Sequence, residues 1–134
     1  FSYAINIMRN NHMSDLTAVE LKPFLPARDF ALSKQFYADI GFTLKWQDET
    51  LAYIAHGNVS FLLQNFYVKE LADNLMLHLL VEDIDAWHAD ISQRYLSQKY
   101  GSQVSPVKTQ PWKMREFIIS DPSGVLWRIA QNIK

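Results

Sequence analysis

The stretch QPWKMREFIISDPSGVLWRIA, residues 110–130, is the part of the sequence that decides the fold. Two apolar runs, residues 116–120 and 125–131, stand on either side of Asp121-Pro122-Ser123-Gly124. These four residue types are typical of a tight turn, and the runs have the length of strands. The stretch therefore predicts a β-hairpin near the C-terminal end of the sequence.

Upstream of this hairpin, the pattern predicts a strand, a helix and a further strand. Asp83 is a candidate N-cap for the helix. The helix has one apolar stripe at helical spacing, formed by Ile84, Trp87, Ile91 and Tyr95. The predicted elements are a strand at residues 75–81, a helix at 84–96 and a strand near 103–108.

The first half of the chain repeats this order of elements. Asp29 is a candidate N-cap, and Gly41 is a candidate end for the helix that follows it. The predicted elements are a strand at residues 17–26, a helix at 30–39 and strands at 42–46, 51–55 and 59–64. A polar joint, residues 65–74, separates the halves. The chain thus contains two βαβββ modules, about residues 17–64 and 75–131.

Bulk composition bounds the class of protein. With 134 residues, 49% of them hydrophobic, the chain is long enough for one domain with a buried core. A net charge of −1 gives no general attraction to nucleic acid or to an anionic membrane. No apolar run reaches the ~20 residues that a membrane-spanning helix needs. The absence of cysteine excludes disulfides and thiol catalysis and fits a cytoplasmic location.

We expect a single domain over residues 14–134. The segment before it, residues 1–13, lacks the features of a secretory signal. Met13 is a candidate natural start, so residues 1–12 are either a non-native addition or a native extension.

Four short motifs in this order resemble the vicinal oxygen chelate superfamily of glyoxalases, dioxygenases and antibiotic-resistance proteins. They are Pro26-Ala27-Arg28-Asp29-Phe30, Val81-Glu82-Asp83-Ile84-Asp85, Gln110-Pro111-Trp112 and Asp121-Pro122-Ser123-Gly124. Over about residues 17–132 the chain is most similar to the bleomycin resistance proteins. The resemblance implies an α+β fold in which two βαβββ modules form a curved mixed sheet around a cleft.

In this superfamily, the enzymes hold a divalent metal with His or Glu side chains on inward-facing strand positions. The matching positions here carry Lys22, Met76 and Arg128. Lysine and arginine only donate hydrogen bonds, and methionine is a soft thioether, so none of the three suits a hard or borderline dication. The resemblance therefore implies a protein without the metal or another cofactor, and a binding protein rather than an enzyme.

A displaced metal site is an alternative interpretation. Strand alternation places Glu20 on the face of Lys22, and His78 on the face of Met76. Specific zinc or iron sites usually need three protein ligands, so we favour the simpler interpretation that these residues line a cavity.

One face of each strand should pack on the helices and the other should line the cleft. We expect the core to contain Phe61, Leu77, Leu79, Val81, Trp127 and Ile129. The opposite face then carries Met76, His78, Leu80, Leu126, Arg128 and Ala130. This mixed and partly apolar face suits a bulky amphipathic guest.

Aromatic residues are candidates for further ligand contacts. Trp112 stands in a loop-like segment, and three interpretations of it are open. It is a ring on which a ligand stacks, a cover for the core, or a contact with a second chain. Trp46 and Tyr53 add aromatic surface if they face the cleft, although core packing is the slightly favoured interpretation of both. The predicted ligand-binding residues are Trp46, Tyr53, Met76, His78, Leu80, Trp112 and Arg128.

The resemblance implies a metal-independent protein that binds an antibiotic and sequesters it, with bleomycin-type glycopeptides as the leading ligands. Lys22 and Arg128 disfavour a cationic ligand unless carboxylates such as Glu116 or Asp48 offset them. Small members of the family form homodimers with shared clefts, often with an exchanged N-terminal arm. The alternatives are a glyoxalase-like or dioxygenase-like metalloenzyme and a sensor or interaction module. We expect neither nucleic acid nor a membrane as partner.

Overall fold

The computed structural model describes residues 15–134. The expected N-terminal extension, residues 1–13, lies outside the described residues. None of the described helices is both long and apolar enough to cross a membrane.

The first module is a four-stranded sheet with one long helix. Its elements are β1 (Phe24–Pro26), α2 (Phe30–Asp39), β2 (Thr43–Gln47), β3 (Leu51–His56) and β4 (Val59–Gln64). The strand order is β1-β4-β3-β2, with β1 parallel to β4 and the other pairs antiparallel. The predicted order of strands and helix in this half is confirmed.

The second module repeats this topology. Its elements are β5 (Met76–Leu80), α4 (Ile84–Ser92), α5 (Leu96–Tyr100), β6 (Lys108–Gln110), β7 (Met114–Ser120) and β8 (Leu126–Asn132). The order is β5-β8-β7-β6, again with the first strand parallel to its neighbour and the others antiparallel. The two modules therefore have the same strand arrangement, as the internal duplication predicts.

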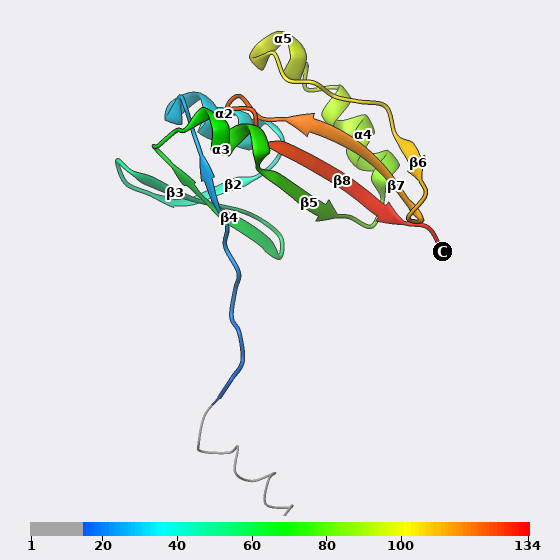
Figure 1. The fold of residues 1–134 in the computed structure, drawn as a ribbon, viewed down its shortest axis with the longest axis horizontal. Helices are drawn as coiled ribbons and strands as arrows, with labels where there is room; N and C mark the ends of the chain where they lie inside the picture. The colour runs from blue at the N-terminus through cyan, green and yellow to red at the C-terminus, as the bar shows by residue number, and fades with distance from the viewer. Residues whose placement is uncertain (1–14) are drawn as a thin grey trace, which may run out of the picture.

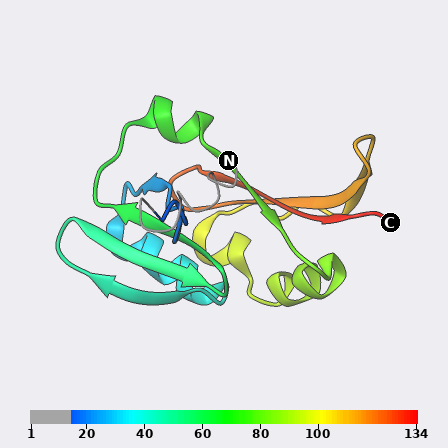
Figure 2. The same cartoon turned by 90° about the horizontal axis from the view of Figure 1, so that it is seen from below.

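The long helices α2 and α4 cover the same side of the two sheets (Figures 1 and 2). Asp29 begins α2, because its side chain accepts a hydrogen bond from the amide of Leu32 at 3.1 Å. Gly41 follows the helix with φ of 99°, a backbone conformation that favours glycine. The helix buries Phe36 and Tyr37 completely, and these rings fix it on the sheet.

A buried polar network joins the two modules. The hydroxyl of Tyr37 on α2 donates to Asp121 Oδ2 at 2.6 Å and accepts from the indole nitrogen of Trp127 at 3.0 Å. The other carboxylate oxygen of Asp121 accepts the amides of Ser123 and Val125 in the β7–β8 turn. Ser123 in turn accepts a hydrogen bond from the amide of Arg28, so the turn and the start of α2 are held together.

The N-terminal strand is shorter than predicted. The expected strand over residues 17–26 is formed only by Phe24–Pro26, and residues 15–23 extend away from the body of the molecule (Figure 1). Alternation of apolar and polar residues makes a segment competent to be a strand, but a strand also needs a neighbouring edge to pair with. None of residues 15–23, here called the arm, belongs to a strand, although the carbonyl oxygen of Pro23 accepts a backbone hydrogen bond from Leu62 of β4 at 2.9 Å.

Two connections also differ from the prediction. The polar joint, residues 65–74, contains a short helix, α3 (Lys69–Asn74). The expected helix over residues 84–96 ends at Ser92, because Tyr95 adopts the left-handed conformation with φ of 55° and turns the chain. Tyr95 is consequently exposed, and Leu96 takes the buried position instead. The strand expected near residues 103–108 starts at Lys108, although Val104 forms one isolated bridge with Ile119.

The predicted division of the sheet faces holds with three exceptions. Phe61, Leu79, Trp127 and Ile129 are buried, as expected. Leu77 and Val81 are only half-buried, although both pack against the core. Ala130 was expected on the open face but is fully buried, since its methyl group lies beside the larger residues Leu80 and Glu116 in the register.

Candidate functional site

A cavity of about 640 Å³ lies between the two modules, where β4 and β5 face each other. Its buried wall is aromatic and comprises Phe42, Phe61 and Trp127, whose ring centroids are 5.6 to 6.0 Å apart. Asn58, Ser60 and His78 add polar groups, and Val19 and Leu21 of the arm complete the lining. The cavity is large enough for a small molecule and offers it mainly apolar contacts.

One carboxylate fastens the arm beside this cavity. Glu20 accepts hydrogen bonds from Ser60 Oγ, from Tyr53 Oη at 2.9 Å and from Lys22 Nζ at 3.0 Å. The Ser60 hydroxyl, then Lys22 and Tyr53, lower the pKa of Glu20 to about 2. Lys22 also lies 5.2 Å from the centroid of the Tyr53 ring. The positive charge predicted at Lys22 is therefore compensated by its neighbour on the arm.

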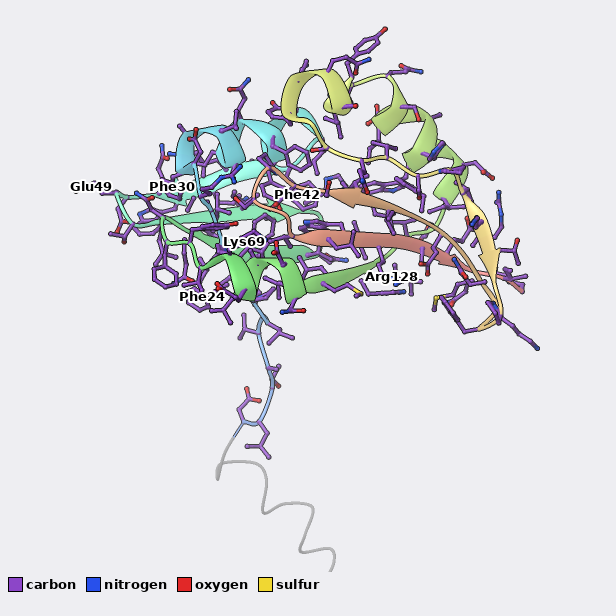
Figure 3. The ribbon with its side chains drawn as sticks, turned by 45° about the horizontal axis from the view of Figure 1, so that its top comes forward. Phe24, Phe30, Phe42, Glu49, Lys69 and Arg128 are labelled. Atoms are coloured by element: carbon purple, nitrogen blue, oxygen red, sulfur yellow. The ribbon has the colours of Figure 1, made fainter. Side chains whose placement is uncertain are left out.

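A second group of side chains lies on the face of the β5–β8 sheet that is turned away from α4, where Arg128 is labelled in Figure 3. The guanidinium of Arg128 donates to Glu116 Oε2 through Nη2 and lies 3.8 Å from the sulfur of Met76 through Nη1. Its central carbon lies 5.7 Å from the centroid of the Trp112 ring. We call Met76, Trp112, Glu116 and Arg128 the Arg128 platform.

Trp112 owes its position to the β6–β7 hairpin. Gln110 pairs with Met114, and the loop between them is closed by a hydrogen bond from the amide of Lys113 to the carbonyl oxygen of Gln110 at 3.1 Å. Trp112 stands in this loop and is 53% exposed, so it does not cover the core. The indole ring is held on the outside of the protein by the guanidinium beside it.

Glu116 is the residue of the platform that the sequence suggested only as one of two carboxylates able to offset Lys22 and Arg128. Its side chain is only 2% exposed, and its second oxygen, Oε1, has no hydrogen-bond partner among residues 15–134. A buried carboxylate of this kind needs a cation beside it, which Arg128 supplies. The sequence offered one signal for the pair, because Glu116 and Arg128 stand on the two strands of the predicted hairpin.

The seven predicted ligand-binding residues fall into two groups. Met76 and Trp112 each lie beside Arg128 in the platform, and His78 and Leu80 lie on the open face of β5 that carries Met76. His78 is paired in register with Arg128 and also lines the cavity, so it connects the two features. Trp46 and Tyr53 pair with each other in the first sheet.

Core packing, the slightly favoured interpretation of Trp46 and Tyr53, is wrong. Trp46 is 53% exposed, and the half-buried Tyr53 uses its hydroxyl to hold Glu20. All five residues of β2 are exposed, so neither face of this strand is covered by another element among the described residues.

The residues at the positions that hold the superfamily metal do not fit one. Met76 and Arg128 meet in the platform, and Lys22 lies on the arm against Glu20 and Tyr53. Glu116, the acidic residue of the platform, is already paired with the guanidinium of Arg128. Within residues 15–134, no three His, Asp or Glu side chains are grouped closely enough to hold an ion. Glu20 and His78 both line the cavity, without a third such ligand beside them.

The fold and the site together define a class of protein. The sequence profile of the Glyoxalase/Bleomycin resistance protein/Dioxygenase superfamily matches residues 15–129. The chain belongs to this superfamily, and its paired βαβββ modules have the vicinal oxygen chelate fold.

Solved structures with the same fold include both binding proteins and an enzyme. A bleomycin-binding protein complexed with bleomycin is 21% identical, with a TM-score of 0.74 over 86% of this chain and 99% of that one. The bleomycin-binding protein of Streptomyces verticillus, complexed with copper(II)-bleomycin, is 23% identical, with a TM-score of 0.73 over 90% and 99% of the two chains. The lactoylglutathione lyase of Agrobacterium tumefaciens is 15% identical, with a TM-score of 0.64 over 86% and 95%. A comparison with curated protein sequences finds no match.

Proposed function

We propose that this protein binds a bulky, aromatic-containing antibiotic without a metal and protects the cell by sequestration in the cytoplasm. A complexed drug does not reach its target, and no bond is made or broken. The observation that carries the proposal is the open face formed by the Arg128 platform and its junction, through His78, with an aromatic-walled cavity. Bleomycin-binding proteins of the same fold support bleomycin-type glycopeptides as the first ligands to test.

Isothermal titration calorimetry with metal-free and copper-loaded bleomycin tests this proposal. We expect a dissociation constant below roughly 100 µM, with loss of affinity in Trp112→Phe. Trp87→Phe is the matched control, because Trp87 lies on α4 beside His56 and outside the platform. Absence of binding heat for both forms of the drug would remove the drug assignment.

Elemental analysis separates the proposal from a glyoxalase-like or dioxygenase-like metalloenzyme. Purified protein should contain nickel, zinc, iron and manganese far below one atom per chain. A stoichiometric metal that persists through purification would instead favour the enzyme. The same preparation serves the calorimetry, so the two functions are tested on one sample.

We also propose that the protein is a homodimer that shares its clefts, with the arm lying on the partner chain. Leu16, Val19 and Leu21 of the arm are at least 90% exposed in the single chain. Half-exposed apolar residues stand on both sheets, including Phe24, Trp46, Met76 and Leu80, and Trp112 is half exposed in the β6–β7 loop. An apolar surface of this extent supports an interface, because monomeric proteins rarely expose large contiguous apolar patches.

A further inference from the structure

Only some of the N–H donors of the Arg128 guanidinium are bound by other residues of the described part of the protein. The guanidinium has five N–H donors, of which Nη2 binds Glu116 and Nη1 faces the sulfur of Met76. A thioether is a weak acceptor, and 3.8 Å is a long approach even to sulfur. No other acceptor is bound to this guanidinium within residues 15–134. Because the side chain is 29% exposed, its remaining donors are accessible from the open face.

Aromatic and apolar surface surrounds these donors. The exposed indole of Trp112 lies next to the guanidinium, and Met76 and Leu80 are each about half exposed on β5. A flat ring that lies on this surface gains stacking contacts and apolar burial. Its edge then meets the N–H groups of Arg128, which point along the plane of the guanidinium.

The charge of the platform is already balanced. Glu116 lies against Arg128 and is itself buried, so a positively charged group of the ligand finds no accessible carboxylate there. An acceptor oxygen of the ligand binds there more favourably than a cation, because a hydrogen bond from the charged guanidinium is about twice as strong as one from a neutral donor. The platform therefore selects ligands that can accept a hydrogen bond, rather than ligands that carry a positive charge.

We propose that Arg128, positioned by Glu116, is the specificity-determining residue of the site, and that it selects a planar aromatic group bearing a carbonyl or carboxylate oxygen. This inference rests on the proposed function and narrows its ligand class. A ligand of the bleomycin type would satisfy it by placing an acceptor-bearing ring, and not its cationic end, on Trp112.

Three probes with one ring system test the preference. 2-Naphthamide carries a neutral acceptor, 2-naphthoate a charged acceptor, and 2-naphthylmethylammonium a cation without an acceptor. The readout is the indole N–H resonance of Trp112 in ¹⁵N-labelled protein, assigned through Trp112→Phe. We expect both acceptor probes to bind about tenfold more tightly than the ammonium probe. Comparison of the amide with the carboxylate shows which acceptor is preferred.

Variants show whether Arg128 makes the distinction. The double variant Glu116→Gln/Arg128→Met avoids an unpaired buried charge and should bind all three probes alike. Arg115→Met is the matched control, because Arg115 lies on β7 and pairs with Asp85 of α4. It should keep the tenfold preference.

The outcomes separate this inference from the proposed function. Equal affinities for the three probes in the unaltered protein, or tighter binding of the ammonium probe, would overturn the role of Arg128 and leave aromatic binding intact. A preference that survives in the double variant would also overturn it. If no probe shifts the Trp112 resonance, the platform is not a ligand site and both proposals fail.

Discussion

At the scale of single residues, buried polar groups carry the most specific interactions of this protein. Tyr37, Asp121 and Trp127 satisfy one another inside an aromatic core, with Tyr37 fully buried. Burial, followed by the nearby charge of Asp121, raises the pKa of Tyr37 well above its ordinary value. Burial likewise raises the pKa of Asp121, against the hydrogen bond from Tyr37 and those from its own turn. Each group therefore depends on its partners.

The substitution Tyr37→Phe should lower the free energy of unfolding by about 2–4 kcal/mol, because it leaves Asp121 Oδ2 and the indole N–H of Trp127 without their partner in the core. Tyr53→Phe is the matched control, since its hydroxyl bonds Glu20 near the surface, and it should cost under about 1 kcal/mol. Urea denaturation of both variants measures the difference. Similar losses in the two would mean that the buried network does not stabilise the fold.

The platform gives a second test at this scale. Glu116→Gln removes the charge that compensates Arg128, and we expect a loss of about 1–3 kcal/mol in the free energy of unfolding. Asp85→Asn is the control. It breaks the exposed ion pair between Asp85 of α4 and Arg115, the neighbour of Glu116 on β7, and should cost less than about 1 kcal/mol. Thermal and urea unfolding measure both losses. A larger loss of stability in Asp85→Asn than in Glu116→Gln would contradict this argument.

At the scale of elements, two short segments determine the shape of the binding face. The β6–β7 loop presents Trp112, and it requires a left-handed residue at Lys113, where φ is 62°. The arm covers one wall of the cavity, and Glu20 holds it there. The loop stands beside the edge strand β6, whereas the arm lies over the interior strands β3 and β4, through Tyr53 and Ser60.

Replacing Lys113 by glycine should raise the free energy of unfolding by about 0.5–1 kcal/mol. Glycine removes the steric cost of the left-handed conformation, and the greater freedom of the unfolded chain offsets part of the gain. Lys108→Gly is the control, because Lys108 lies within β6, where glycine weakens a strand. The urea midpoints should move in opposite directions, and a fall for Lys113→Gly would contradict the argument.

The attachment of the arm should depend on pH. The pKa of Glu20 is lowered from 4.5 to about 2, mainly by Ser60, so its attachment is complete above pH 4.5 and is lost as the pH falls toward 2. NMR titration of the Glu20 carboxyl carbon should therefore show little change between pH 5 and about 3.5. In Ser60→Ala the pKa should return toward 4.5. A midpoint near 4.5 in the unaltered protein would show that the arm is not held in this way.

At the scale of the whole molecule, apolar residues of the arm and of both modules are exposed in the single chain, and the proposed homodimer would cover them. Sedimentation equilibrium should give twice the chain mass of 15.6 kDa. The double variant Val19→Asp/Leu21→Asp should shift the equilibrium to the monomer by at least tenfold, since charged groups would have to be buried at the interface. Thr17→Asp/Ala18→Asp is the control. It adds the same charge but replaces smaller side chains than Val19 and Leu21, so it should shift the monomer–dimer equilibrium less. A monomer at all concentrations would refute the dimer.

Much of the fold follows from local features of the sequence. Asp29 and Asp83 cap helices where predicted, and Asp121–Gly124 forms the expected turn. Such features act over a few residues, so they can be predicted from their immediate neighbours. The duplication of the modules follows from the order of these elements.

The open face of β5 and β8 was equally predictable, because alternation along a strand places Met76, His78 and Leu80 on one side. The contacts that make this face a candidate site were not. The Arg128–Glu116 pair, the position of Trp112 beside it and the exposure of Trp46 depend on which strands become neighbours. Tyr95 was expected to continue a helix and instead turns the chain, so that Leu96 enters the core.

The sequence by itself determined the class of this protein: two βαβββ modules, with Lys22, Met76 and Arg128 at the positions that the resemblance assigns to the metal ligands of the superfamily's enzymes. Only the tertiary structure decided how these residues are compensated, with Lys22 against Glu20 and Arg128 between Glu116 and Trp112. The physical reason is that periodicity fixes which way a side chain points along its own strand. Its partner across the sheet is fixed by pairing between segments that are distant in sequence.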